Sequence, residues 1–458
     1  MLSGTRATHR IPALDPWFDR LVRACGQRHL HRSLGTSAVA IGGAASPCCL
    51  FQGQLGDARV ESIPDIWHGA GFRELRAAML SGARDERCQR CFAAEETGGM
   101  SLREQFNISL ARHMPRMRGL PAIDPVAPPP PVSLDIRFDN LCNFTCRTCY
   151  HGASSKWFTE AKRLNWTVAP DALIESFNSP ADGVAAVFPL LDQIESIYWA
   201  GGEPLLQEQH YVILRRLIDL GRTDVALSYN TNLSNLRLGQ RDLFELWSHF
   251  PKIYLEVSID GSGARGELIR EGLNWSNFTA NLARVMRTCP HIRIGFGITV
   301  SVFNVAILTD FYNELMALGQ FDPNGFDFHV LLVPDYYSIQ ILPAAMKAEI
   351  ARRLRDFAET LPAGTGPATA GAGRFPGNPV SRQLLHVAEH MMAADRSTEV
   401  EQFRTVTALL DGMRGRSTAT VCPELAALLK PPGASMPRGI SGAIRRRLAD
   451  LRAAVSAG

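Results

Sequence analysis

Short runs of β-branched and aromatic residues recur along the middle of the chain, and longer segments with helical periodicity separate them. Such runs are typical of strands, and the intervening lengths suit helices. The strands are predicted at Ser133–Phe138, Ile194–Ala200, Val225–Asn230, Ile253–Ile259, Ile292–Val300 and Phe326–Val333. The helices are predicted at Ser154–Leu164, Ala172–Phe177, Gln207–Leu220, Gln240–Ser248, Asn277–Thr288 and Ala306–Leu318. Because a closed barrel needs eight strand–helix units, this alternation predicts an α/β fold with a partial, TIM-like (β/α)6 barrel.

The composition changes on both sides of this alternation. A proline-rich stretch at 121–131 cannot pair in a sheet, so we expect a stiff linker there. It separates a small N-terminal cysteine-rich module at 1–120 from the barrel at 132–340. Residues 341–458 are predicted to form a mostly helical C-terminal extension, with a loop rich in Gly, Ala and Pro at 362–379.

The overall composition narrows the class of protein. Hydrophobic residues make up 46% of the 458 residues and charged residues 20%, so the chain can bury a large core. The net charge is only +3, which argues against a nucleic-acid partner. No apolar run reaches the roughly 18 residues that a membrane span needs, and the first thirty residues lack the layout of a signal peptide. We therefore expect a cytoplasmic protein without a membrane partner.

Eight of the ten cysteines fall in the first third of the chain, which in a reducing compartment argues for metal ligation rather than disulfides. Cys142, Cys146 and Cys149 follow the first predicted strand with the spacing C-x3-C-x2-C. Three thiolates on one loop can hold three corners of a cubane iron–sulfur cluster and leave one iron open. The alternative is a zinc site, which needs a fourth ligand that His151 could supply.

A second motif follows the second predicted strand. It reads Gly201-Gly202-Glu203-Pro204. Two glycines permit close approach of the backbone to a ligand, and Glu203 offers an acceptor for a cationic group. Both motifs come at the carboxyl ends of strands, the face on which βα barrels place their chemistry.

The two motifs, in this order, resemble those of the radical S-adenosylmethionine (radical SAM) superfamily. The resemblance covers about residues 132–333. It implies that Cys142, Cys146 and Cys149 bind a [4Fe-4S] cluster and that the loop at 201–204 contacts the methionine amino group of SAM. The implied reaction is the reductive cleavage of SAM to methionine and a 5′-deoxyadenosyl radical, which abstracts hydrogen from a substrate.

The resemblance extends to the ends of later strands. It implies that Asn232, Ser258 and Asp260 hydrogen-bond the ribose or the carboxylate of SAM. Arg270 matches an arginine that meets the SAM carboxylate, and Tyr150 would lie near the adenine. The alternatives are turn or helix-cap chemistry for the first three residues and a surface ion pair for Arg270.

The sequence assigns no catalytic hydrogen donor and no residue that binds the substrate. Four residues within predicted strands are candidates for the barrel interior, and for each of them a packed core or an outward position is the alternative. These residues are Tyr254, Glu256, Phe296 and His329.

The N-terminal cysteines form a separate group. They are Cys25, Cys48, Cys49, Cys88 and Cys91. Together with Ile66-Trp67, Glu95-Glu96 and Ser101-Leu-Arg103, their order resembles a twitch module, a shortened relative of the SPASM domain. The resemblance implies an auxiliary [4Fe-4S] cluster held by Cys25, Cys48, Cys88 and Cys91, with Cys49 as a substitute for Cys48. A zinc site that includes His29 and His31, or free thiols, are the alternatives.

Twitch and SPASM proteins commonly act on peptides or on small alcohols and sugars. By resemblance we expect crosslinking, epimerisation or oxidation of a ribosomally made peptide, with an electron donor such as a flavodoxin or ferredoxin. The alternatives are oxidation or epimerisation of a small metabolite, or a non-enzymatic iron–sulfur or zinc protein that binds a partner.

Overall fold

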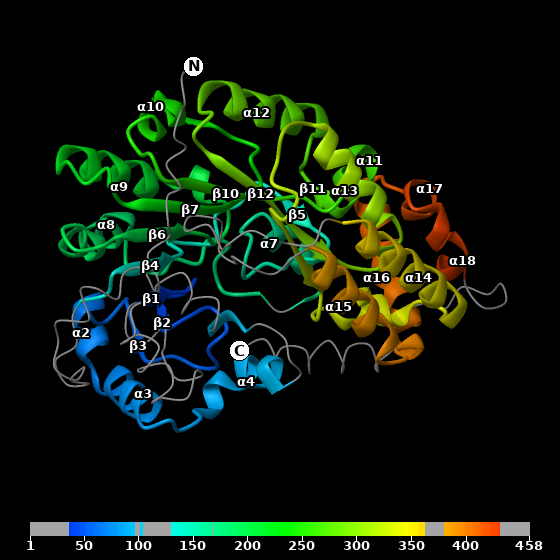
Figure 1. Cartoon of the computed structure of the whole chain (residues 1–458), viewed down its shortest axis with the longest axis horizontal. Coiled ribbons are helices and arrows are strands. Elements are labelled where there is room, and N and C mark those ends of the chain that lie inside the picture. The colour runs from blue at the N-terminus through cyan, green and yellow to red at the C-terminus, as the bar shows by residue number, and fades with distance from the viewer. Residues whose placement is uncertain (1–35, 97–100, 104–129, 167, 362–379, 431–458) are drawn as a thin grey trace, which may run out of the picture.

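The structure is a computed structural model that describes residues 36–96, 101–103, 130–166, 168–361 and 380–430. One large sheet organises the fold, with its strands in the order β13-β12-β10-β7-β6-β4-β1-β2-β3. Figure 1 shows the N-terminal helices α2 to α4 (blue) below the sheet and the C-terminal helices α14 to α18 (yellow to red) at its right-hand side. In the described part of the chain, no helix is long and apolar enough to cross a membrane.

Six consecutive strands of this sheet are parallel and form the partial barrel. They are β4 (Ser133–Ile136), β6 (Ser196–Trp199), β7 (Ala226–Thr231), β10 (Ile253–Ser258), β12 (Arg293–Val300) and β13 (Phe326–Val330). Each of them overlaps one of the predicted strands. The predicted fold class, an α/β protein with a partial (β/α)6 barrel, is therefore confirmed.

Helices follow the strands in the expected alternation. They are α7 (Trp157–Arg163), α8 (Pro180–Val187), α9 (Glu208–Asp219), α10 (Leu243–Trp247), α11 (Gly263–Ile269), α12 (Trp275–Thr288) and α13 (Leu308–Ala317). The predicted helix at Ala172–Phe177 is wrong. That segment runs beside the end of β4, where Ile174 N–H donates to Asn140 Oδ1 (2.8 Å). The helix begins only at Pro180, because Ser179 accepts a capping hydrogen bond from Asp182 N–H.

The two faces of the parallel sheet differ in chemistry. Paired residues share a face, and one row on β4, β6, β7 and β10 is Ile136, Trp199, Tyr229 and Leu255. This row is buried beneath helices, as the ring contacts of Trp199 with His210 on α9 and of Tyr229 with Trp247 on α10 show. The next row, on the inner face, is Asp135, Tyr198, Ser228 and Tyr254. We call the space that this inner face encloses the lumen. Because parallel sheets usually carry apolar residues on both faces, these polar side chains make the inner face a candidate surface for a ligand.

The N-terminal segment continues the same sheet. Strand β1 (Thr36–Val39) pairs parallel with β4, with Thr36 opposite Ser133. Strands β2 (Ala44–Ser46) and β3 (Gly56–Asp57) then add antiparallel, and α2 (Ile63–His68), α3 (Ala70–Leu80) and α4 (Gln89–Glu96) follow. Most of the proline-rich stretch at 121–131 lies outside the described residues.

The C-terminal extension is helical where it is described. It comprises α14 (Ala344–Thr360), α15 (Val380–Met392), α16 (Val400–Arg414), α17 (Thr418–Val421) and α18 (Ala426–Leu429). Helix α15 covers the outer edge of β13: the side chain of Gln383 accepts from Phe328 N–H (2.8 Å) and donates to Phe326 C=O (2.9 Å). The predicted loop at 362–379 lies outside the described residues.

Candidate functional site

The cysteine loop, residues 139–150, begins just beyond the end of β4 and is held on several sides. Within it the two-residue strand β5 (Thr145–Cys146) pairs with β11 (Arg270–Glu271), so that Cys146 lies opposite Arg270. Helix α7 also holds the loop, since Trp157 Nε1 donates to Cys146 C=O (2.9 Å). Cys142, Cys146 and Cys149 are therefore presented by a loop whose backbone is tied to neighbouring elements.

The three thiols lie close enough to influence one another. Burial raises the pKa of Cys142, raises that of Cys149 to about 12, and raises that of Cys146 further, and neighbouring thiols add to the rise for Cys146 and Cys149. Thiolates are the ligand form of cysteine, so these buried thiols need a bound cation to release their protons. Phe144 N–H points at Cys142 Sγ (3.5 Å), which suits a sulfur that carries negative charge. The loop thus fits an iron–sulfur cluster.

The spacing of the sulfurs bears on the zinc alternative. Among the described residues, just one group of three Cys, His, Asp or Glu ligand atoms lies within 4.8 Å, and it contains neither cysteines nor His151. A single zinc ion gathers its ligand atoms closely, whereas the corners of a cubane belong to different irons. Among the described residues, the cysteine loop thus offers no preformed group of three close ligand atoms for a single zinc ion.

The Gly-Gly-Glu-Pro loop packs directly on the cysteine loop. Gly201 and Gly202 have φ of +82° and +44°. A Cβ on Gly202 would lie 2.2 Å from Leu141 O, and one on Gly201 would lie 2.5 Å from Arg137 Cβ. Glu203 N–H donates to the same Leu141 carbonyl (2.7 Å). The glycines thus serve the contact between the two loops, a reason that the sequence did not disclose.

Glu203 is 1% exposed, and its carboxylate accepts hydrogen bonds from neighbouring residues of the protein. Oε1 accepts from Thr231 Oγ1 (2.6 Å) and from Leu205 N–H (3.1 Å), and Oε2 accepts from Asn232 N–H (2.7 Å). Burial raises the pKa of Glu203 to about 7, although these three donors favour its ionised form. Through these three hydrogen bonds the carboxylate joins the ends of β6 and β7.

Two further polar residues also bond within the chain. The buried Asn232 donates from Nδ2 to Asn143 Oδ1 (3.0 Å) in the cysteine loop, and its Oδ1 accepts from Ser234 N–H (2.9 Å). Ser258 donates its hydroxyl hydrogen to Asn230 Oδ1 on β7. The side chain of Tyr150 is different: it is 46% exposed at the end of the cysteine loop.

Asp260 and Arg270 form an ion pair beside the cysteine loop. Arg270 Nε lies 2.8 Å from Asp260 Oδ2, and Oδ1 accepts from Arg270 Nη2 (3.1 Å) and from Thr299 N–H (2.8 Å). The arginine side chain is 12% exposed and the aspartate 0%, so this is a buried pair and not a surface one. Burial lowers the pKa of Arg270, but the adjacent Asp260 carboxylate raises it, and the net shift is upward.

Residues that the sequence did not single out hold the other side of the cysteine loop. Arg147, fully buried between Cys146 and Cys149, donates from Nε to Leu268 C=O (3.0 Å) and from Nη2 to Asp411 Oδ1 on α16. One turn along α16, Arg414 pairs with Glu160 on α7 (2.6 Å). The C-terminal extension therefore reaches the cysteine loop, and because 264 residues separate Arg147 from Asp411, no local pattern could announce it.

Three N-terminal cysteines surround one pocket. Cys48, Cys88 and Cys91 line it together with Phe51 and Arg103. Burial raises the pKa of Cys88 to about 12 and raises that of Cys91, with the neighbouring Cys48 adding to both. Cys49 is exposed and does not line this pocket, and Cys25 lies outside the described residues.

Arg103 supplies positive charge to this pocket. Its guanidinium pairs with Glu95, and both side chains are at most 5% exposed. Nη1 of Arg103 is buried and has no hydrogen-bond partner among the described residues. A buried N–H without an acceptor, beside three thiols, suits an anionic cluster in the pocket.

Comparisons with known proteins agree with this chemistry. Residues 32–92 match the model of SPASM, an iron–sulfur cluster-binding domain. The S-adenosylmethionine-dependent nucleotide dehydratase RSAD2 of Siniperca chuatsi is 24% identical over 180 residues, which cover 38% of this chain and 45% of that protein. The chain thus spans less than half the length of this relative.

Solved structures give a weaker likeness. One is anSMEcpe with bound AdoMet, at 18% identity and a TM-score of 0.36, covering 50% of this chain and 61% of that one. Another is SuiB of Streptococcus suis bound to its precursor peptide SuiA, at 13% identity and a TM-score of 0.33, covering 60% and 59%.

The SPASM match, the SAM-dependent relative and the two packed motif loops point to the same chemistry. The chain carries a SPASM-type iron–sulfur module ahead of its barrel, and part of the chain is similar to an enzyme that depends on S-adenosylmethionine.

Proposed function

We propose that the protein cleaves SAM reductively and uses the resulting 5′-deoxyadenosyl radical to abstract hydrogen from a substrate held in the lumen. The observation that carries this proposal is the contact of Gly202 and Glu203 with Leu141, which brings both motif loops to one rim of the barrel. When bound, the cluster supplies the electron and SAM supplies the radical. The chain binds and orients these groups.

The proposed ligands of the SAM-binding cluster are Cys142, Cys146 and Cys149. The backbone of 201–204 is the candidate contact for the methionine part of SAM. Asn232, Ser258, Arg270 and Tyr150 line the same rim and stay candidates for the remainder. Glu203 and Asp260 already accept hydrogen bonds from the protein, which supports a positioning role for both carboxylates. Glu203 fixes the diglycine loop. Asp260 holds Arg270 opposite Cys146.

For the auxiliary cluster we propose Cys48, Cys88 and Cys91 as ligands, with Cys25 as the fourth. The shared pocket supports the first three, and the exposure of Cys49 supports Cys48 over its neighbour. A fully ligated cluster would transfer electrons, with a flavodoxin or ferredoxin as the external donor.

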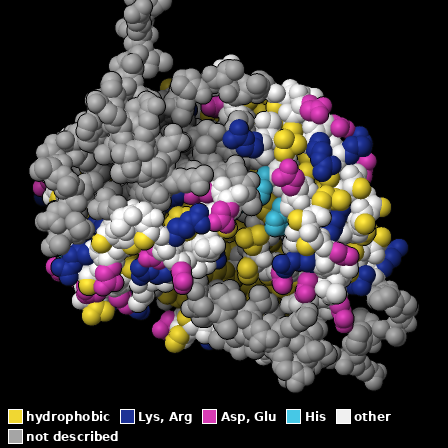
Figure 2. Space-filling model, turned by 60° about the horizontal axis from the view of Figure 1, so that its bottom comes forward, with side chains coloured by type: hydrophobic (Ala, Val, Ile, Leu, Met, Phe, Trp, Pro, Cys, Tyr) yellow, Lys and Arg dark blue, Asp and Glu magenta, His cyan; other side chains and the backbone are white. Residues whose placement is uncertain are grey.

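The proposed substrate is a ribosomally made peptide, on which SPASM and twitch proteins commonly act. A small metabolite is the second candidate. The polar lumen supports an enzyme over a protein that only binds a partner, since an electron-transfer scaffold needs no polar interior. On the face shown in Figure 2, the coloured Lys and Arg side chains are interspersed with Asp and Glu, which gives no support to a nucleic-acid substrate.

The decisive experiment is anaerobic reconstitution followed by reduction in the presence of SAM. The proposal expects about eight irons per chain and the release of 5′-deoxyadenosine. The triple variant C142A/C146A/C149A should release none, whereas the matched control C49A should behave as the parent protein. SAM cleavage by the triple variant would refute the ligand assignment.

The substrate class needs a second measurement. Where a short peptide is encoded beside the gene, its perdeuterated form should transfer deuterium into 5′-deoxyadenosine. If the peptide transfers no deuterium and a deuterated small metabolite does, the substrate is a small metabolite and not a peptide.

A further inference from the structure

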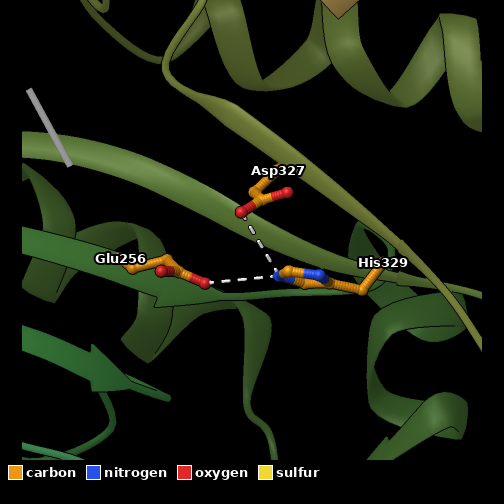
Figure 3. A group of neighbouring side chains, drawn as sticks. All are labelled: Glu256, Asp327 and His329. Atoms are coloured by element: carbon orange, nitrogen blue, oxygen red, sulfur yellow. Dashed lines mark ion pairs between the residues drawn. The ribbon is translucent and has the colours of Figure 1, made fainter. Parts of the chain in front are cut away.

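Three ligand-type side chains that neither motif uses meet in the lumen. Glu256 lies on β10, and Asp327 and His329 lie on β13, with β12 between these two strands. Figure 3 shows the two carboxylates pointing at the imidazole of His329 from different strands. We call these three residues the lumen triad.

Strand β12 allows this meeting because it carries glycine on its inner face. Gly297 pairs with Asp327 on one side and with Ser258 on the other. A Cβ on Gly297 would lie 2.7 Å from Glu256 Oε1. Any larger residue at this position would obstruct the carboxylate, so the glycine gap lets side chains of β10 and β13 approach across the intervening strand.

The distances within the lumen triad distinguish two kinds of contact. His329 Nε2 lies 3.6 Å from Glu256 Oε1 and 3.5 Å from Asp327 Oδ2. A charge-assisted hydrogen bond would bring such atoms to about 2.7–2.9 Å. Two ligand atoms at bond lengths of 2.0–2.2 Å from a tetrahedral ion lie about 3.3–3.6 Å apart. The observed separations match ligand atoms around a small ion.

Glu256 provides an independent indication of a ligand. Its side chain is 3% exposed, and Oε1, which faces His329, accepts no hydrogen bond from the described residues. Buried charges in proteins are paired or coordinate metals. The imidazole of His329 is 48% exposed, so the lumen triad is open on that side.

We propose that Glu256, Asp327 and His329 bind a divalent cation of the zinc class. Two carboxylates balance the charge of such an ion, and neutral imidazole with carboxylate oxygen is a ligand set that zinc accepts. Three protein ligands leave one coordination position open, which would hold a carboxylate or carbonyl oxygen of the substrate. This role in substrate binding rests on the proposed function, whereas the binding of the cation does not.

The test uses the full chain with its iron–sulfur clusters, incubated with one equivalent of zinc sulfate, desalted and measured without SAM. Metal analysis should find one zinc per chain in addition to the iron. X-ray absorption at the zinc edge should show only nitrogen and oxygen neighbours at about 2.0–2.2 Å, because sulfur ligation from a cysteine site would appear near 2.3 Å.

Variants then locate the ion. E256Q and H329Q should each lower the zinc retained at least tenfold, and H291Q, which alters an exposed histidine outside the lumen, should retain it. Iron content and circular dichroism verify that each variant is folded. The X-ray absorption spectrum is recorded on the parent protein, so it tests the proposal even if a variant fails to fold.

Three outcomes would overturn the proposal: no zinc retained by the parent protein, sulfur in the zinc shell, or full retention by the E256Q/H329Q double variant. The first would point to a cationic group of the substrate as the partner of these carboxylates. Because zinc is measured without SAM, a protein that binds zinc but never cleaves SAM would refute the proposed function alone.

Discussion

Replacement of Asp411 by leucine should destabilise the protein from a distance, through the buried arginine of the cysteine loop. Arg147 is 0% exposed, and Asp411 is its carboxylate partner. Removal of one member of a buried ion pair typically costs about 3–5 kcal/mol, because the other charge stays buried without compensation. Asp411 also accepts from Thr418 N–H (2.6 Å) and Thr418 Oγ1 (2.9 Å), so D411L should reach the upper part of this range.

The double variant R147M/D411L should be more stable than D411L by about 2 kcal/mol, because two apolar side chains leave no buried charge. Urea unfolding followed by tryptophan fluorescence measures both values. The matched control is E349Q on α14, where Arg352 and Glu349 are 61% and 57% exposed, so the loss of this surface pair should leave the free energy of unfolding close to that of the parent protein. A cost of D411L as small as that of E349Q, or a double variant less stable than D411L, would refute the reasoning.

Three further predictions concern the motif loops and the N-terminal pocket. G202A should abolish SAM cleavage, because the added methyl group would lie 2.2 Å from the carbonyl oxygen of Leu141. In the control G221A, the glycine also has positive φ but no atom lies within 4 Å of the added Cβ, so the free energy of unfolding should fall by only about 1–2 kcal/mol and activity should persist. The pKa of Glu203 is raised to about 7 in the folded chain, so the free energy of unfolding of the cluster-free protein should fall as pH rises from about 4.5 to 7, and E203Q should flatten this slope in urea titrations. C48S should lower the iron content from about eight to about four per chain and C49S should not; loss of iron in C49S but not in C48S would replace Cys48 by Cys49 in the ligand set.

The barrel could be predicted from the sequence because each of its strands carries a local signal. A run such as Ile253–Ile259 alternates residues that pack beneath the helices with residues that face the lumen, and its length is that of a strand. Both motif loops come at strand ends, so their meeting at one rim followed from the parallel topology. The helix expected at Ala172–Phe177 failed, because the tertiary hydrogen bond between Ile174 and Asn140 overrides a weak local preference.

Other features of the site have no local signal. Nothing near Arg147 indicates that its partner is Asp411, and nothing in the Gly-Gly-Glu-Pro motif indicates that Gly202 faces Leu141. Glu256 and His329 were candidates for the interior, but their approach depends on Gly297 on a strand between them. Such contacts are set by register and by long-range packing, which a single sequence does not encode locally.

Gln383 has a consequence for how a peptide could be recognised. Its amide group accepts from Phe328 N–H and donates to Phe326 C=O. Without Gln383, these backbone groups of the outermost strand would be available to an incoming peptide. Extended peptides often bind by adding themselves to such an edge and copying its hydrogen bonds. Here that mode of binding is closed at Phe326 and Phe328, because Gln383 already bonds both backbone groups.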